Sequence, residues 1–151
     1  MNDIGGIFNV DPNSWIDSLN TYQKNIINQL YTQTNDYEAV ANKWLTATIS
    51  TNVPFGTQKN SSIFFEKVLD EIEAFFTGDE KYNDSRVAIL KESGVVQSYI
   101  VASISIALAP VLGTSAPFLS PVIAIVLFTI GKIGLNAWVA SREEKRKNNM
   151  K

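Results

Sequence analysis

The positions of apolar residues along the chain predict a protein built of helices. From Trp15 to Leu30, apolar side chains recur three or four residues apart, and the positions between them are mostly Asn, Gln, Thr and Ser. That spacing places the apolar side chains on one face of a helix. A second set with the same period follows from Tyr37 to Leu45. We therefore expect one long helix over residues 14–49, kinked near Asn35, or two helices if Asn35 is the N-cap of a second helix.

A further amphipathic helix is predicted after a turn-rich linker at residues 50–60. We expect Ser61 or Ser62 to cap this helix and Gly78 to end it. Its apolar face is rich in Phe, and its other face carries acidic residues that we expect to be solvated. Another helix is predicted to begin at Asp84 or Ser85 and to continue into the stretch that follows.

That stretch, residues 93–131, is 39 residues long and contains no charged side chain. Two apolar segments, residues 95–112 and 118–138, lie on either side of a break at residues 113–120. As helices they would be about 27 and 32 Å long, close to the ~30 Å hydrocarbon thickness of a bilayer. Gly94 is a candidate hinge in the first helix. The second is predicted to begin at Ser120 and Pro121 and to run to Lys147.

Two environments suit this apolar hairpin. It can enter a bilayer, or it can be the buried centre of a soluble bundle that the amphipathic helices surround. In the second segment, the eleven Leu, Ile, Val and Phe residues favour insertion by roughly 3–7 kcal/mol in total. Lys132, Asn136, Pro121 and the glycines oppose insertion. For each segment alone, the free energies that favour and oppose insertion are therefore nearly equal. We expect the two segments to insert as a paired hairpin, because their small and polar residues allow close packing.

The membrane interpretation assigns two sets of residues. The membrane-inserting side chains would be Val96, Ile100, Ile104, Leu108, Val122, Ile125, Leu127, Phe128 and Ile130. The membrane-interface side chains would be Lys132, Trp138, Arg142, Lys145, Arg146 and Lys147. Lys132 lies close enough to the end of its segment to extend its ammonium group to the membrane surface.

Charge is distributed unevenly along the chain and adds to the membrane interpretation. Residues 1–92 carry a net charge of −6, and residues 132–151 carry +4. A basic tail directly after an apolar helix favours an anchor at a membrane surface over nucleic-acid binding. Both termini would then be cytoplasmic. The N-terminus has no basic region followed by an apolar run, so we predict no secretory signal.

Composition argues against an enzyme. The chain has no Cys and no His, which removes thiol nucleophiles, the commonest general base and the commonest transition-metal ligands. Glu66, Asp70 and Glu73 form a carboxylate row at helical spacing, but nothing else in the sequence converges on it. We therefore predict no catalytic residue, no metal site and no cofactor.

The sequence thus predicts a single domain over residues 1–151, with an all-α fold of four or five helices. Residues 1–13 would be a loose arm, 14–92 an amphipathic helical part, 93–140 the apolar hairpin and 141–151 the basic tail. The alternative for the arm is that Ile4, Ile7, Phe8 and Val10 dock on the body of the protein. The expected function is membrane insertion, with pore formation by an oligomer as an extension. This arrangement is similar in outline to helical pore-forming proteins, an analogy of architecture alone. The alternative is a soluble cytoplasmic interaction module that binds a helical protein partner.

Overall fold

Helices account for nearly all of the described chain. The computed structural model describes residues 4–52, 57–91 and 96–149, and these ranges contain eight α-helices, two 3-10 helices and no strand. The prediction of an all-helical protein is confirmed, and the helices outnumber the four or five expected. In chain order they are η1 (Ile4–Phe8), α1 (Asn13–Asp17), α2 (Thr21–Thr34), α3 (Tyr37–Asn52), α4 (Thr57–Thr77), η2 (Glu80–Tyr82), α5 (Asn83–Lys91), α6 (Gln97–Leu112), α7 (Ala116–Ile133) and α8 (Leu135–Asn149).

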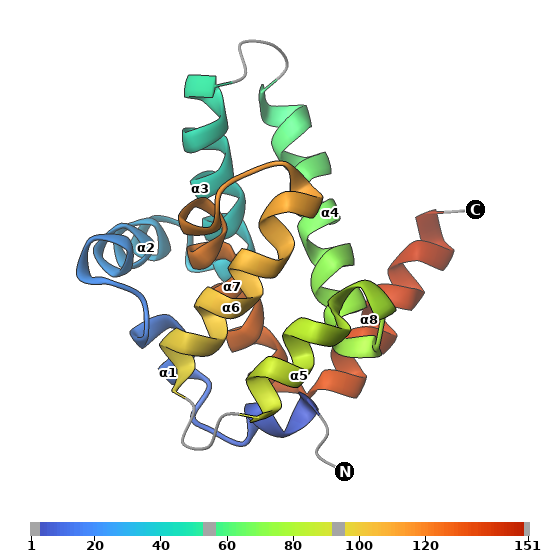
Figure 1. Ribbon diagram of the computed structural model, residues 1–151. Coiled ribbons are helices and arrows are strands. Elements are labelled where there is room, and N and C mark those ends of the chain that lie inside the picture. The colour runs from blue at the N-terminus through green and yellow to red at the C-terminus, as the bar shows by residue number, and fades with distance from the viewer. Residues whose placement is uncertain (1–3, 53–56, 92–95, 150–151) are drawn as a thin grey trace.

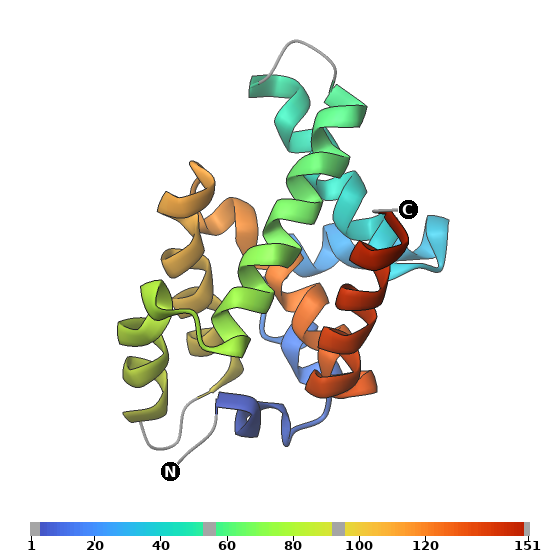
Figure 2. The same ribbon diagram turned by 90° about the vertical axis from the view of Figure 1, so that its right-hand side faces the viewer.

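Helix α7 runs through the middle of the molecule, and the other helices are arranged around it (Figure 1). It packs against α6, α1 and α3, while α5 lies on the far side of α6. Helices α3 and α4 form an antiparallel pair that extends beyond the rest of the fold (Figure 1). Helix α8 follows α7 directly and lies beside α4 (Figure 2). The most apolar helix of the chain is thus also its central one.

The single long helix expected over residues 14–49 is wrong, because the chain leaves the helical path twice. After α1, Asn20 has extended backbone angles, and its side-chain oxygen accepts the Gln23 N–H at 2.8 Å, which caps α2. Asn35 then ends α2 with φ 54°, a left-handed conformation that Asn tolerates better than most residues. Asp36 accepts the Glu38 N–H at 3.0 Å and so begins α3.

Other predicted helix boundaries also move. Helix α4 begins at Thr57, one turn before the predicted caps, and α3 extends to Asn52, so both helices take up part of the predicted linker. The helix predicted from Asp84 or Ser85 is α5, which begins at Asn83 and ends at Lys91. The candidate hinge at Gly94 lies outside the described residues.

The last predicted helix also differs at both ends. Helix α7 begins at Ala116, so Pro121 lies inside it and not at its first turn. Pro121 has no N–H to donate to the Pro117 carbonyl four residues earlier. Gln23 of α2 donates to that carbonyl instead, at 3.2 Å, so the lost helical bond is replaced. Helix α7 ends at Ile133, and Gly134 separates it from α8.

The N-terminal segment is docked on the body of the protein. Ile4 is buried, and the Phe8 ring lies 5.9 Å from the Trp15 ring and 5.2 Å from the Phe76 ring of α4. Trp15 is fully buried. Ile4 therefore belongs to the core, with Ile7 and Phe8 packed against it, which is the docked arrangement that the apolar side chains of this arm allow.

Candidate membrane-interaction site

Helix α6 has two apolar faces in different environments. One face is packed inside the protein through Ile100, Val101, Ile104, Ser105, Leu108 and Ala109. The other exposes large apolar side chains: Tyr99 and Ile106 on the face away from the packed one, Val111 in the last turn and Val96 at the N-cap are 41, 65, 48 and 55% exposed. We call these four residues together the outer face of α6. No charged side chain lies in the sequence between Val96 and Leu112, so the helix itself contributes only apolar, hydroxyl and amide groups to this surface.

Helix α7 is enclosed by the protein. Its buried residues are Leu119, Pro121, Val122, Ile123, Ala124, Ile125, Val126, Leu127 and Ile130. Near its C-terminal end the backbone comes close to α1. A Cβ added at Gly131 would lie 3.4 Å from the Cβ of Pro12, the residue that precedes α1, which is an ordinary van der Waals distance. At its N-terminal end the Trp44 indole N–H donates to the Phe118 carbonyl at 2.9 Å, which fixes α3 against α7.

Hydroxyl groups connect α6 to α7 without leaving polar atoms unpaired. The Ser105 and Ser120 oxygens lie 3.2 Å apart across the helix pair. Each is also within bonding distance of a carbonyl of its own helix, Ser105 to Val101 at 2.7 Å and Ser120 to Ala116 at 3.0 Å. Serine hydroxyls bonded in this way are compatible with an apolar environment, whether that is a protein core or lipid.

A tight turn joins the two helices. Gly113 ends α6 with φ 71°, in the left-handed region that favours glycine. The N–H groups of Gly113 and Thr114 both donate to the Ala109 carbonyl, the second at 3.0 Å. The predicted break at residues 113–120 is thus much shorter, because α7 already begins at Ala116.

The structure brings most of the predicted membrane-inserting residues together inside the protein. Ile100, Ile104, Leu108, Val122, Ile125, Leu127 and Ile130 are all buried, and Phe128 is half-buried. Val96 alone of this set is on the surface. In this conformation the hairpin therefore packs through most of the residues expected to contact lipid, and the outer face of α6, which shares only Val96 with that set, is accessible.

The predicted interface residues are mostly engaged with α4. Trp138 and Arg142 are each 5% exposed. Arg142 pairs with Glu66 at 2.9 Å and with Asp70, and Arg146 contacts Glu73 through two nitrogens at 2.8 and 2.9 Å. Lys145 lies 3.7 Å from Glu66, whereas Lys147 is exposed. The carboxylate row of α4, expected to be only solvated, is in fact the partner of the basic tail.

This ion-pair cluster changes the acidity of one carboxyl group. The hydrogen bonds from Arg146 lower the pKa of Glu73 below its ordinary value of 4.5, partial burial opposes the shift, and the charges of Arg146 and Arg142 add to it. Glu73 therefore stays ionised at any pH where the ordinary carboxylates are ionised. The pairing between α4 and α8 is accordingly retained across the neutral range.

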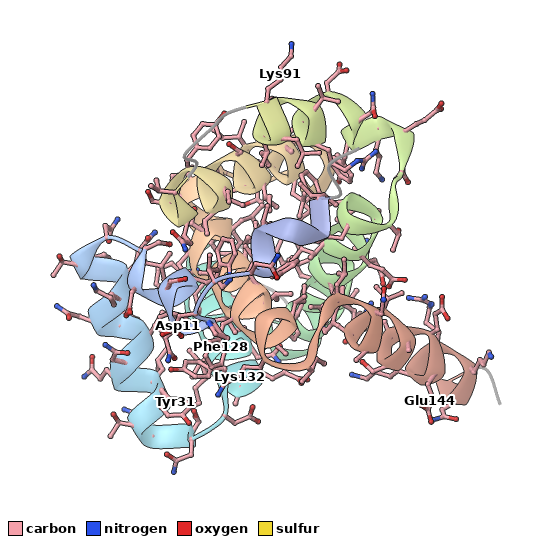
Figure 3. The ribbon with its side chains drawn as sticks, turned by 90° about the horizontal axis from the view of Figure 1, so that it is seen from below. Asp11, Tyr31, Lys91, Phe128, Lys132 and Glu144 are labelled. Atoms are coloured by element: carbon pink, nitrogen blue, oxygen red, sulfur yellow. The ribbon has the colours of Figure 1, made fainter. Side chains whose placement is uncertain are left out.

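Lys132 lies at the end of an aromatic column formed by residues of α2, α3 and α7. Figure 3 shows Phe128 and Lys132 beside α2, on the side that carries Tyr31. The Tyr31 and Tyr37 rings stack at 4.2 Å, Tyr37 meets Phe128 edge-on at 4.8 Å, and the Lys132 ammonium lies 5.5 Å from the Phe128 ring centre. The exposed ammonium of Lys132 is thus close to a favourable cation–π position.

Sequence reasoning missed the outer face of α6. Both faces of this helix are apolar, so periodicity carries no signal for which one is covered. Tyr99 was the available indication, because a phenol at the edge of an apolar run suits a surface position. Within the described ranges no group of three or more acidic side chains is arranged to hold a metal ion.

Helix α7 is the one helix, among the residues with described structure, that has the length and apolar composition to cross a membrane. More than half of that helix, 56%, is buried in the protein, which is also typical of the core helix of a soluble fold. Comparisons of the chain with models of protein families, with curated proteins and with solved structures gave no significant match.

Proposed function

We propose that this protein acts on membranes by inserting its α6–α7 hairpin into a bilayer. One observation carries the proposal: a helix with no charge from Val96 to Leu112 exposes large apolar side chains to solvent and packs its other face on a helix whose one charge is Lys132 in its last turn. Tyr99 and Ile106, seven residues apart, lie on one face of α6, and an exposed apolar patch marks an interaction site. The bilayer is the partner that matches it, since both helices of the pair are predominantly apolar.

The order of events follows from the burial of α7. Seven Leu, Ile and Val side chains of this helix are buried, and exposing them to water would cost roughly 10–20 kcal/mol at about 1.5–3 kcal/mol each. That cost equals or exceeds the ~5–15 kcal/mol stability of a typical domain. Helix α7 therefore leaves the core only into another apolar medium. We infer that the outer face of α6 contacts the bilayer first and that α7 follows.

The hairpin has dimensions that suit this role. With 16 and 18 residues, α6 and α7 are about 24 and 27 Å long, slightly shorter than the ~30 Å hydrocarbon layer. The hydroxyls of Ser105, Ser120 and Thr129 are already bonded to carbonyls of their own helices, so the pair enters with these groups satisfied. In the inserted state, α6 and α7 form the C-terminal hairpin of the fold and α1–α5 its amphipathic part.

The proposal extends to assembly and location. Inserted hairpins that associate side by side would form a pore, with the serine and threonine positions available for contacts between helices. Because both ends of a hairpin are on one side of the bilayer, both termini would remain cytoplasmic.

Flotation with lipid vesicles tests the proposal. We expect the purified full-length protein to float with the vesicles and to release an entrapped dye. The variant Tyr99→Ser/Ile106→Ser/Val111→Ser should do so at least tenfold less at equal protein concentration. A matched control, Tyr22→Ser/Ile63→Ser/Val10→Ser, removes the same three residue types from exposed positions elsewhere and should behave like the wild type.

A second candidate function is a soluble helical module that binds a protein partner, and the enclosure of α7 by α1, α3 and α6 favours it. The same experiment separates the two. A folded monomer that stays at the bottom of the gradient with vesicles of every composition would exclude membrane insertion and leave the soluble module.

A further inference from the structure

The joint between α7 and α8 is a single residue, Gly134. Its φ of 94° and ψ of 146° lie in a region that glycine adopts readily and other residues rarely. The Gly134 N–H donates to the Ile130 carbonyl at 2.7 Å, and the Trp138 N–H donates to the Gly134 carbonyl at 3.0 Å. The helical hydrogen bonds of α7 thus continue up to Gly134, and those of α8 begin at it. A change in the backbone angles of this one residue would convert α7 and α8 into one straight helix.

Ion pairs to α4 hold α8 in the bent position. The basic face of α8 consists of Arg142, Lys145 and Arg146, and it meets Glu66, Asp70 and Glu73 of α4, which are spaced three or four residues apart. Both sets follow the period of a helix, so the two helices pair over two turns although they are about 70 residues apart in sequence. Trp138, buried at the start of α8, adds an apolar contact.

Two features make this pairing exchangeable. The side chains of Lys145 and Arg146 are 53 and 47% exposed, so a competing anion can reach this part of the basic face from solvent, whereas that of Arg142 is 6% exposed. Among the described residues, the buried Nε of Arg142 has no hydrogen-bond acceptor, and the Glu73 oxygen nearest to it in the cluster is 3.6 Å away. A ligand with more acceptor oxygens than a carboxylate would satisfy Arg142 better.

We propose that the basic face of α8 is a binding surface for anionic phospholipid headgroups, which the carboxylates of α4 occupy until the bilayer replaces them and Gly134 straightens. This inference rests on the proposed membrane function. The same side chains of α8 can bind the carboxylates of α4 or the phosphates of lipid, because guanidinium groups bind carboxylate and phosphate oxygens in the same forked geometry.

The straight form has the layout of a membrane anchor. Helix α7 is uncharged from Ala116 to Gly131, and Arg142 would lie about 15 Å beyond Lys132 along a continuous helix. Trp138 would then lie between the apolar run and the basic residues, at the depth where Trp is enriched in membrane helices. Lys145 and Arg146 would extend further into the headgroup layer.

A distance measurement between α4 and α8 tests the inference. The chain has no cysteine, so Thr77→Cys and Asn148→Cys, both at exposed positions, can carry a spin-label pair on the full-length protein. We expect the distance to increase in phosphatidylglycerol vesicles and to stay unchanged in phosphatidylcholine vesicles or with inorganic phosphate. If inorganic phosphate alone separates the labels, the surface is a simple anion site and the lipid assignment is wrong.

Gly134→Ala tests the joint itself. An added Cβ at Gly134 would meet no heavy atom within 4 Å, so alanine opposes the bend through the backbone alone and favours the straight helix. We expect the labels to move apart in this variant even without lipid. Gly78→Ala is the matched control, because Gly78 also has a positive φ, 97°, and open space around it. An unchanged distance in a folded Gly134→Ala protein would overturn the hinge.

Variants that remove the carboxylates of α4 provide a second, independent test of the inference. Glu66→Gln/Asp70→Asn/Glu73→Gln removes the internal partner and should tighten binding to phosphatidylglycerol vesicles about tenfold relative to a control with the same net charge. That control, Asp17→Asn/Glu80→Gln/Asp84→Asn, alters exposed carboxylates elsewhere. If the two triple variants bind phosphatidylglycerol vesicles equally well, this inference is refuted and the proposed function stands. The same holds if the protein floats with these vesicles while the distance between the labels on α4 and α8 stays unchanged. Failure to float with any vesicle would refute both.

Discussion

The hydroxyl oxygens of Ser105 and Ser120 lie 3.2 Å apart where α6 crosses α7. This contact joins the two apolar helices α6 and α7. It also offers a way to ask whether the helices act as a unit, because the chain contains no cysteine and a pair introduced at these two positions would be the one pair able to form a disulfide.

We predict that a Ser105→Cys/Ser120→Cys variant forms a disulfide on oxidation, because the two side-chain atoms are already in contact. If the hairpin enters the bilayer as a pair, the oxidised and reduced forms should cause equal dye release from vesicles. Release that falls severalfold on oxidation and returns with a reductant would show that α6 and α7 must separate. The single variant Ser105→Cys is the control for the substitution itself.

The two faces of α6 should respond differently to truncation. Leu108→Ala removes a fully buried side chain and should lower the free energy of unfolding by about 2–5 kcal/mol. Ile106→Ala, on the outer face, should change it by less than about 0.5 kcal/mol. Urea unfolding followed by circular dichroism measures both. A large loss of stability in Ile106→Ala would mean that this face is covered in solution, for example by a second copy of the chain.

The sequence was sufficient to predict an all-helical fold and part of its core. The apolar periodicity that placed Trp15, Ile27, Val40 and Leu45 on inner faces holds, since all four are buried, but Tyr22, placed on the same face by that periodicity, is 71% exposed. It could not fix where helices end, because Asn35 is compatible with a kink, an N-cap or the left-handed C-cap that it adopts. Local sequence offers these alternatives, and packing against α7 selects among them.

Gly131 and Gly134 illustrate the same limit. Both lie near the end of α7 and look alike in sequence. Gly131 is helical and lies within contact distance of Pro12, whereas Gly134 has a φ of 94° at the joint before α8, whose basic side chains pair with α4. In both cases the neighbouring contact comes from a segment distant in sequence. The ion pairs between Arg142 and α4 were unpredictable for this reason, although the helical spacing of both charge sets was visible.

Acid should weaken the attachment of α8. The pKa of Glu73 is lowered in the folded protein, so its contribution to stability is complete above its ordinary value of 4.5 and is lost as pH falls through the folded-state pKa. We predict that the wild type loses stability below about pH 4.5 and that Glu73→Gln has a flatter profile in that range. Urea unfolding between pH 3 and 7 provides the comparison, with Glu80→Gln at an exposed site as the control. Parallel profiles for wild type and Glu73→Gln would contradict the prediction.

Alkali should act at a different place, the buried phenol of Tyr82. Burial raises the pKa of Tyr82 well above its ordinary value of 10.0, and the hydrogen bond from its hydroxyl to Glu71, at 2.5 Å, raises it further. A group whose pKa is raised by folding stabilises the protein fully below the unfolded-state pKa and loses that contribution as pH rises beyond it. We therefore expect the stability of the wild type to fall from about pH 10 upward. Tyr82→Phe should be less stable at pH 7, because Glu71 loses a donor, yet less sensitive between pH 9 and 11.

The exposed Tyr22, changed to Phe, is the matched control and should leave both the stability and its alkaline profile as in the wild type. Thermal unfolding followed by circular dichroism at each pH gives the comparison. Tyr82 contacts Glu71 and Phe75 of α4, whereas Glu66, Asp70 and Glu73 of the same helix pair with α8, so we expect alkaline unfolding to begin at Tyr82 while the α4–α8 ion pairs persist. A spin-label distance between α4 and α8 that stays constant to pH 10.5 in the folded protein would support that order. An increase that accompanies the first loss of Tyr82 burial would show that the two regions unfold together.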